Sequence, residues 1–294
     1  MQLRGILPPV PTPFARDGAL DLASLQELIR RLAPQVDGFL ILGSNGEAAY
    51  LSEEERRAVL EAAREAIPRG MPMLAGTGGE ATALVAERSR AAAAAGADAV
   101  LVLAPHYYRA AMTTEVLERH YRAVADASPV PLLVYNIPQV TGVAHPPAQV
   151  ARLAAHPKVT GIKDSSGDIL NLTEIVRLAP DGFTTLTGNA PTLLPALAVG
   201  AAGGILAAAN VMPGAYRALF AAFHAGDLAG ARRLQFLTNP LAYAVTRDSG
   251  VAGLKAAMRQ LGLPAGFPRA PLQDVSDEFN SRLAALLAEA PLFA

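Results

Sequence analysis

Cysteine is absent from this 294-residue sequence, and neither sign of charge is in clear excess. Without cysteine there can be no disulfides, thiol nucleophiles or thiolate metal sites, and a chain without disulfides suits a reducing compartment, so we expect a cytoplasmic protein. The 25 basic and 26 acidic residues give a formal net charge of -1, which offers no electrostatic attraction for nucleic acid or an anionic membrane. A small molecule is therefore the expected partner.

The sequence also lacks a convincing signal peptide or membrane span. Residues 1–14 carry one charge and a short apolar run interrupted by four prolines, which is too brief and too rigid for a signal peptide. The uncharged stretch 182–216 is longer than the roughly 20 residues that a spanning helix needs. Prolines, asparagines and a Gly-Gly pair divide it into short pieces, so we expect a buried strand–helix–strand segment there.

Short apolar runs alternate eight times with stretches in which apolar residues recur every three or four positions, which predicts eight strands each followed by a helix. The runs are nearly continuous in apolar character, as in a parallel sheet that is covered by helices. The expected strands are Gly5–Phe14, Val36–Gly43, Met71–Gly78, Ala99–Pro105, Leu132–Pro138, Val159–Ser165, Thr184–Asn189 and Gly204–Asn210, and the expected helices are Leu22–Leu32, Glu53–Ala66, Glu80–Ala95, Thr114–Ala127, Pro146–Ala155, Ile169–Leu178, Thr192–Ala198 and Pro213–His224.

This alternation predicts an α/β protein with the (β/α)8 TIM-barrel fold, and a doubly wound open sheet is the alternative fold. After His224 the strand signals stop, and three amphipathic stretches, Leu228–Leu237, Gly250–Leu261 and Ser276–Leu287, predict a C-terminal helical appendage. We therefore expect a catalytic barrel over residues 1–224 and a C-terminal helical subdomain over residues 225–294.

Polar residues at the carboxyl ends of the expected strands are the candidates for chemistry, because the active sites of such barrels are built there. They are Thr12, Ser44, Asn45, Glu47, Thr77, Tyr107, Tyr108, Tyr135, Asn136, Lys163, Asp164, Ser165, Asn189 and Asn210.

Lys163 is unusual because it continues the apolar strand Val159–Ile162, where a charged amine costs desolvation free energy. Burial favours the neutral amine, which can attack a ketone and form an imine that later accepts the electrons of a carbanion. Alternation puts Gly161 on the same face, where we expect it to leave room for the lysine. The other interpretation is a structural lysine that pairs with Asp164 or reaches solvent.

Two further segments could complete such a site. Tyr135, at the end of the preceding strand, could transfer protons to and from the reacting oxygen, or it could be a core tyrosine with a local hydrogen bond. The loop Gly43-Ser44-Asn45-Gly46-Glu47 combines glycines with small polar residues, so its amides could hold a carboxylate.

Two other chemistries are disfavoured. Gly76-Thr77-Gly78-Gly79 imitates a dinucleotide-binding turn, but Asp98 precedes the next strand, whereas a ribose-binding acid should follow it. The five histidines show no metal-ligand spacing, and Glu53-Glu54-Glu55 fits the first turn of a helix. We expect neither a metal nor a cofactor.

Three ordered motifs, Gly43–Glu47, Tyr135-Asn136-Ile137-Pro138 and Gly161-Ile162-Lys163-Asp164-Ser165, resemble the signature of the dihydrodipicolinate synthase/N-acetylneuraminate lyase family of class I pyruvate-dependent aldolases. The resemblance covers nearly the whole chain. It implies that Lys163 is the Schiff-base lysine and that Tyr135 is the proton-transfer phenol.

The same resemblance implies further site residues. Ser44 and Asn45 would lie at the pyruvate carboxylate, with the Ser44 hydroxyl in the proton relay. Tyr107 would enter the site of a neighbouring protomer, so a homotetramer built as a dimer of dimers is expected. Ile205 would line the pocket beside the lysine.

Two departures bear on the substrate. In the synthases of this family, threonine usually takes the position of Asn45, and an arginine for the substrate carboxylate takes the position of Val140. The Ser-Asn-Gly-Glu loop and several later segments instead resemble 4-hydroxy-2-oxoglutarate aldolases. These segments are Tyr107-Tyr108-Arg109, Ala244-Val245-Thr246-Arg247, Gly253-Leu254-Lys255 and Arg269-Ala270-Pro271-Leu272-Gln273.

The sequence therefore predicts a lyase that cleaves a 4-hydroxy-2-oxo acid, with 4-hydroxy-2-oxoglutarate giving pyruvate and glyoxylate as the main hypothesis. Lys163 would form the imine, Tyr135 would remove the C4 hydroxyl proton with help from Ser44 and Tyr107, and Ser165 is a candidate for the distal carboxylate. The alternatives within the family are condensation of pyruvate with aspartate semialdehyde and cleavage of a sugar acid. The alternative from another class is a non-catalytic barrel that binds a metabolite.

Overall fold

The computed structural model describes residues 3–290, and these fall into two compact units. The first unit contains residues 3–4 and 73–205, and the second contains residues 5–72 and 206–290.

The first unit contains six parallel strands, which neighbour one another in the order in which they occur along the chain. A doubly wound sheet would reverse its strand order at a switch point, and these six strands do not. They are β3 (Met73–Gly76), β4 (Ala99–Leu103), β5 (Leu132–Asn136), β6 (Val159–Asp164), β7 (Thr184–Thr187) and β8 (Gly203–Ile205), and nearly all their residues are buried.

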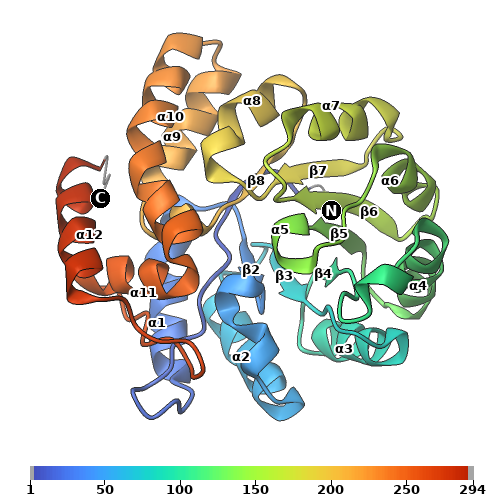
Figure 1. Cartoon of the computed structure of the whole chain (residues 1–294), viewed down its shortest axis with the longest axis horizontal. Coiled ribbons are helices and arrows are strands. Elements are labelled where there is room, and N and C mark those ends of the chain that lie inside the picture. Colours follow the sequence, from blue (N-terminus) through green and yellow to red (C-terminus); the bar gives the residue numbers. More distant parts are fainter. Residues whose placement is uncertain (1–2, 291–294) are drawn as a thin grey trace. The chain divides into compact units, whose positions relative to one another are not determined.

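The helices of the first unit follow the strands in turn, and helices α3, α4, α6 and α7 flank strands β3 to β7 (Figure 1). The helices are α3 (Thr82–Ala94), α4 (Thr114–Ala127), α5 (Pro138–Thr141), α6 (Pro147–Ala154), α7 (Ile169–Leu178) and α8 (Leu193–Ala198). The sequence predicts a strand that ends at Pro138, and the structure has the short helix α5 beginning there instead. A proline at the first helical position needs no hydrogen-bond partner for its nitrogen, so it starts this helix instead.

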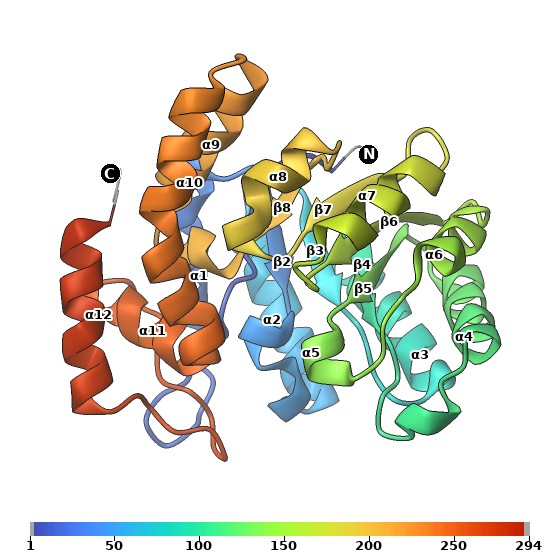
Figure 2. The same ribbon diagram turned by 45° about the horizontal axis from the view of Figure 1, so that its top comes forward.

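The second unit joins the start of the chain to its C-terminal part. Its elements are β1 (Gly5–Leu7), α1 (Leu22–Leu32), β2 (Phe39–Ile41), α2 (Glu53–Ala66), α9 (Pro213–His224), α10 (Leu228–Tyr243), α11 (Gly250–Gln260) and α12 (Asp277–Glu289). Helix α9 packs along α10, and α11 packs against α12 (Figure 2). The expected strand Gly5–Phe14 is correct in place but wrong in extent, because four of the residues after Leu7 are prolines that donate no ladder hydrogen bond.

Local capping explains why most helix bounds were predictable. Five expected helices, Leu22–Leu32, Glu53–Ala66, Thr114–Ala127, Ile169–Leu178 and Pro213–His224, are confirmed with the same ends. Ser52 accepts a hydrogen bond from Glu55 N while the Glu55 carboxylate accepts from Ser52 N, a reciprocal cap that fixes the start of α2. Thr113 and Asp168 cap α4 and α7 through their side chains.

Along the chain, eight strands alternate with helices and are followed by α10 to α12, so the predicted (β/α)8 barrel with a C-terminal helical appendage is confirmed. The boundary near residue 224 stays a prediction, although α9 ends there. Within residues 3–290 no helix is long and apolar enough to cross a membrane, and the stretch 182–216 contains β7, α8, β8 and the start of α9.

Candidate functional site

Lys163 and Tyr135 face each other across strands β5 and β6. They are register partners, and Lys163 Nζ donates a hydrogen bond to Tyr135 Oη at 3.3 Å. The Lys163 nitrogen also lies 4.3 Å from the centre of the Tyr135 ring. The two residues are only 4% and 5% exposed, and the described residues show no ion pair between Lys163 and Asp164. The lysine is therefore buried against a phenol, and neither structural interpretation of it fits this geometry.

Gly188, which follows β7, gives Lys163 the space that it occupies. A methyl group at Gly188 would lie 2.8 Å from Lys163 Cε and would collide with the hydroxyl of Ser165. The side chains of Lys163 and Ser165 thus lie side by side against this glycine. The sequence did not single out Gly188, because its function depends on two side chains of another strand.

The prediction that Gly161 leaves room for Lys163 is wrong. A methyl group at Gly161 would lie 2.5 Å from the carbonyl oxygen of Thr184, and its other near neighbours are Thr184 Cβ and Leu133 Cγ. Gly161 therefore allows β6 to lie close to β7, and it does not make room for Lys163.

A buried polar cluster lies close to Asn136. His145 is 1% exposed, and its ring contacts Gln149 Oε1 and Tyr121 Oη, each at 3.1 Å. Burial lowers the pKa of His145 to about 4 and raises the pKa of the Tyr121 phenol. Both groups are therefore neutral near neutral pH, and they act here as hydrogen-bonding groups.

The loop that contains Ser44 and Asn45 lies in the second unit. Ser44 is exposed and Asn45 is half-buried, on a single 3₁₀ turn, Ser44–Gly46. The amides of Gly46 and Glu47 donate within the turn, to Gly43 O and Ser44 O. These two amides are therefore not available to hold a carboxylate. The predicted roles of Ser44 and Asn45 in binding the pyruvate carboxylate stay predictions.

A buried ion pair holds the end of this loop. Lys255 Nζ donates to the Glu47 carboxylate and also to the carbonyl oxygens of Thr12 and Phe267, both at 2.7 Å. Burial lowers the pKa of Lys255 to about 8, against the opposing attraction of Glu47. Glu47 itself has a left-handed backbone with φ of 53°, which a non-glycine residue rarely adopts.

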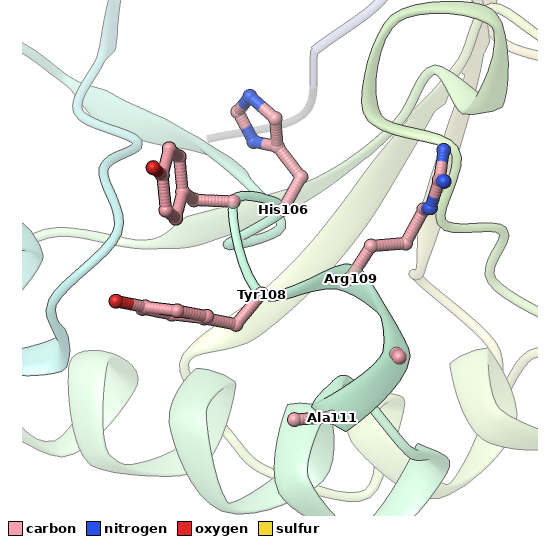
Figure 3. Close-up of a pocket in the computed structure, with 6 residues that line it drawn as sticks. His106, Tyr108, Arg109 and Ala111 are labelled. Carbon is pink, nitrogen blue, oxygen red and sulfur yellow. The ribbon is translucent and has the colours of Figure 1, made fainter.

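Tyr107 projects from the loop after β4, where it and Tyr108 are 77% and 74% exposed. Their rings meet edge to face at 5.0 Å, and the Glu80 carboxylate accepts hydrogen bonds from His106 N and Tyr107 N. The loop borders a surface hollow of about 630 Å³, in which Tyr108 and Arg109 point to opposite sides (Figure 3). The structure of one chain therefore leaves Tyr107 in solvent.

Ile205 is fully buried at the end of β8, and its place beside the lysine stays a prediction. Gly78 packs against Leu103, and Asp98 accepts a hydrogen bond from Met73 N at the start of β3. In the part of the chain that the structure describes, no group of three His, Asp or Glu residues could hold a metal.

Comparisons with known proteins agree with this geometry. The model of the dihydrodipicolinate synthetase family matches residues 2–290. A 4-hydroxy-tetrahydrodipicolinate synthase of Methanoculleus marisnigri is 39% identical over 96% of this chain and 98% of its own length, and 4-hydroxy-tetrahydrodipicolinate synthase 1 of Streptomyces coelicolor is 39% identical over 95% and 91%.

Solved structures of related proteins are also similar to this chain over nearly its whole length. The dihydrodipicolinate synthase DapA-2 of Bacillus anthracis has a TM-score of 0.95 at 29% identity and covers 99% of both chains. A putative dihydrodipicolinate synthase of Thermus thermophilus has a TM-score of 0.88 at 44% identity and covers 96% of both chains. These similarities extend over the strands that carry the buried lysine and tyrosine.

Proposed function

The chain belongs to the dihydrodipicolinate synthetase family, and on that premise we propose that it condenses pyruvate with aspartate semialdehyde to 4-hydroxy-tetrahydrodipicolinate. It is a lyase of the pyruvate-dependent class I aldolase type. The observation that carries the proposal is the buried contact of 3.3 Å between Lys163 Nζ and Tyr135 Oη.

The contact suits imine chemistry on a 2-oxo acid. The Lys163 amine attacks C2 of pyruvate, and the Tyr135 phenol gives a proton to the departing hydroxyl, which leaves as water. Loss of a proton from C3 gives an enamine, and this carbon attacks the aldehyde of the second substrate, whose oxygen takes up a proton. The amino group of the product then displaces Lys163 and closes the ring.

The other site residues are part of the same proposal. Ser44 would relay protons to Tyr135, Asn45 would bind the pyruvate carboxylate, Ser165 would contact the distal carboxylate and Ile205 would line the pocket. Tyr107 would enter the site of a neighbouring protomer in a homotetramer. A related chain with a TM-score of 0.94 and 29% identity is described as the first monomeric dihydrodipicolinate synthase variant, and the mass of the purified protein in solution tests the homotetramer.

Cleavage of 4-hydroxy-2-oxoglutarate, the main hypothesis from the sequence, becomes the second candidate. The relatives named above are synthases, and none of them carries the name of that aldolase. One observation still favours the aldolase. Val140, at the position where the resemblance expects an arginine for the substrate carboxylate, is 60% exposed and has no charge.

A trapping experiment tests the class of chemistry. Borohydride with pyruvate should add one reduced pyruvate to the protein, seen by intact-mass spectrometry. The sequence contains only three lysines, Lys158, Lys163 and Lys255, so the site is easily assigned. The variant Lys163→Met should lose the adduct, whereas Lys158→Met should keep it. An unmodified wild-type protein would favour a non-catalytic metabolite-binding barrel.

A substrate comparison tests the finer proposal. The purified protein is assayed with pyruvate plus aspartate semialdehyde and, separately, with 4-hydroxy-2-oxoglutarate. We expect kcat/KM for the condensation to exceed that for the cleavage by at least 100-fold. The opposite order would favour the aldolase.

A further inference from the structure

The residues that directly follow Tyr135 and Lys163 form a second cross-strand pair. Asn136 lies opposite Asp164 in the register of β5 and β6, as Tyr135 lies opposite Lys163. Successive residues of a strand point to opposite faces, so these two pairs lie on opposite sides of the sheet. Asn136 Nδ2 donates to Asp164 Oδ2 at 3.0 Å on one side, and Lys163 Nζ donates to Tyr135 Oη at 3.3 Å on the other.

The Asp164 carboxylate is held by neutral donors only. It is 2% exposed and accepts hydrogen bonds from Asn136, from Asn171 Nδ2 of helix α7 at 3.1 Å, from Ser166 N at 2.7 Å and from the Ser166 hydroxyl. No cation pairs with Asp164 within residues 3–290. A buried charge that loses one of its donors is costly, so these bonds fix where the carboxylate lies.

Asn136 is held from its other side. Its Oδ1 accepts a hydrogen bond from the backbone N–H of His145 at 3.2 Å. The His145 ring contacts the Tyr121 hydroxyl, which lies 3.3 Å from the carbonyl oxygen of Val102 on β4. Because burial lowers the pKa of His145 to about 4, no positive charge arises there near neutral pH to draw Asp164 away from Asn136. The amide is thus anchored to two strands and to the segment before α6.

The pairing of β5 with β6 is irregular at its start and regular at its end, where Ser165 N also donates to Asn136 O at 2.8 Å. The pairing of β5 with β6 shifts between Leu132 and Leu133, so that Leu132 lies opposite Val159 and Leu133 lies opposite Gly161. Such an irregularity bends a strand and changes its local twist. The Asn136–Asp164 link lies at the regular end, directly after the Tyr135–Lys163 pair, and there it joins the two strands through side chains in addition to the backbone.

We propose that Asn136 and Asp164 are positioning residues, whose hydrogen bond sets the distance and orientation at which the Tyr135 phenol meets the Lys163 amine. This inference rests on the proposed function, because it assigns the pair a role in forming the imine. Neither residue touches the substrate. They act through Tyr135, which moves protons only when it is well placed relative to the carbinolamine.

The test compares Asn136→Ala with Asn171→Ala, both in the full chain. Each variant removes one amide that donates to Asp164 Oδ2, but only Asn136 connects the carboxylate to β5. We measure the rate of borohydride trapping with pyruvate, kcat and KM, and thermal unfolding as a check on folding. Asn136→Ala should lower the trapping rate and kcat at least ten-fold and change KM less than three-fold. Asn171→Ala should lower the trapping rate and kcat less than three-fold.

A double-mutant cycle separates positioning from general damage. In a Tyr135→Phe background the phenol is gone, so adding Asn136→Ala should change the slow residual trapping rate less than two-fold. An equal ten-fold loss in that background would show that Asn136 acts independently of Tyr135 and would overturn the inference. Equal effects of Asn136→Ala and Asn171→Ala would overturn it too. If Asn136→Ala does not fold, Asn136→Ser is measured against the same limits.

The wild-type control distinguishes a failure of the proposed function from a failure of the positioning inference. A wild-type protein that shows no pyruvate adduct at Lys163 defeats the proposed function itself. A wild-type protein that traps pyruvate at Lys163, together with an Asn136→Ala variant that traps it at the wild-type rate, defeats only the positioning inference.

Discussion

Lys255 and Glu47, which are separated by 208 positions in the sequence, form an ion pair from which solvent is fully excluded. Two carbonyl oxygens complete the contacts of the ammonium, and the backbone N–H of Arg269 donates to the second oxygen of Glu47 at 2.8 Å. The pair joins helix α11 and the segment after it to the loop that follows β2. The position of that loop therefore depends on the C-terminal part of the chain.

Replacing Lys255 should destabilise the protein strongly. Lys255→Met leaves the Glu47 carboxylate buried without its cation, which costs about 3–5 kcal/mol. The free energy of unfolding from urea titrations measures the loss. The matched control is Arg177→Met, which breaks the exposed pair Arg177–Glu174 and should leave the free energy of unfolding nearly unchanged. Similar losses in the two variants would show that Lys255 contributes no more than a surface charge.

Adding a methyl group at Gly188 should impair imine formation. Gly188→Ala brings a carbon to 2.8 Å from Lys163 Cε and onto the Ser165 hydroxyl, so one of these side chains must move. We expect the rate of borohydride trapping with pyruvate to fall at least ten-fold. Gly79→Ala is the control, because the nearest atom to its new methyl group is the flexible end of Arg88. A wild-type trapping rate in Gly188→Ala would contradict the close packing seen here.

Acid should destabilise the fold through His145. Burial, the largest cause, lowers the pKa of this histidine to about 4 from an ordinary value of 6.5, so the folded chain binds fewer protons than the unfolded chain between these values. The stability is therefore complete above pH 6.5 and is lost as the pH falls toward 4. At pH 5 the loss from this group is about 2 kcal/mol.

Urea titrations at pH 7.5 and pH 5 measure this loss. His145→Asn removes the titrating group, so its stability should change less between the two pH values than that of the wild type. The same substitution at the exposed His224 should leave the pH dependence unchanged. If the stability of His145→Asn depends on pH as strongly as that of the wild type, the acid sensitivity belongs to other groups.

An arginine at position 140 should favour the semialdehyde. Val140 is exposed on the segment after Tyr135, where the resemblance expects an arginine for the substrate carboxylate. A charged hydrogen bond to that carboxylate corresponds to about ten-fold in affinity, so Val140→Arg should raise kcat/KM for aspartate semialdehyde about ten-fold. Val140→Gln, of similar length but uncharged, should not. An identical effect of both variants would assign the change to side-chain size.

The meeting of Lys163 and Tyr135 was predictable because barrel chemistry gathers at the ends of strands. Lys163 and Tyr135 are strand residues whose neighbours in the sequence already indicate burial, and adjacent parallel strands bring their ends together. The helix bounds were predictable because residues such as Ser52 mark their starts locally.

The features that were missed depend on contacts between distant parts of the sequence. Nothing near Lys255 indicates that its partner is Glu47, and nothing near Gly188 indicates that Lys163 fills the space above it. The neutral state of His145 likewise follows from complete burial, which the short proline-containing segment before α6 does not reveal. Such properties are set by tertiary packing, and local sequence patterns do not record packing.

The alternation of side chains at the end of β6 restricts insertions and deletions within this strand. Lys163 and Asp164 are consecutive, yet one contacts Tyr135 and the other contacts helix α7 on the opposite side. Inserting or deleting one residue earlier in β6 would exchange these sides, placing the carboxylate where the amine belongs. We expect natural variants to differ in the length of the loops around this strand, while the spacing within it stays constant.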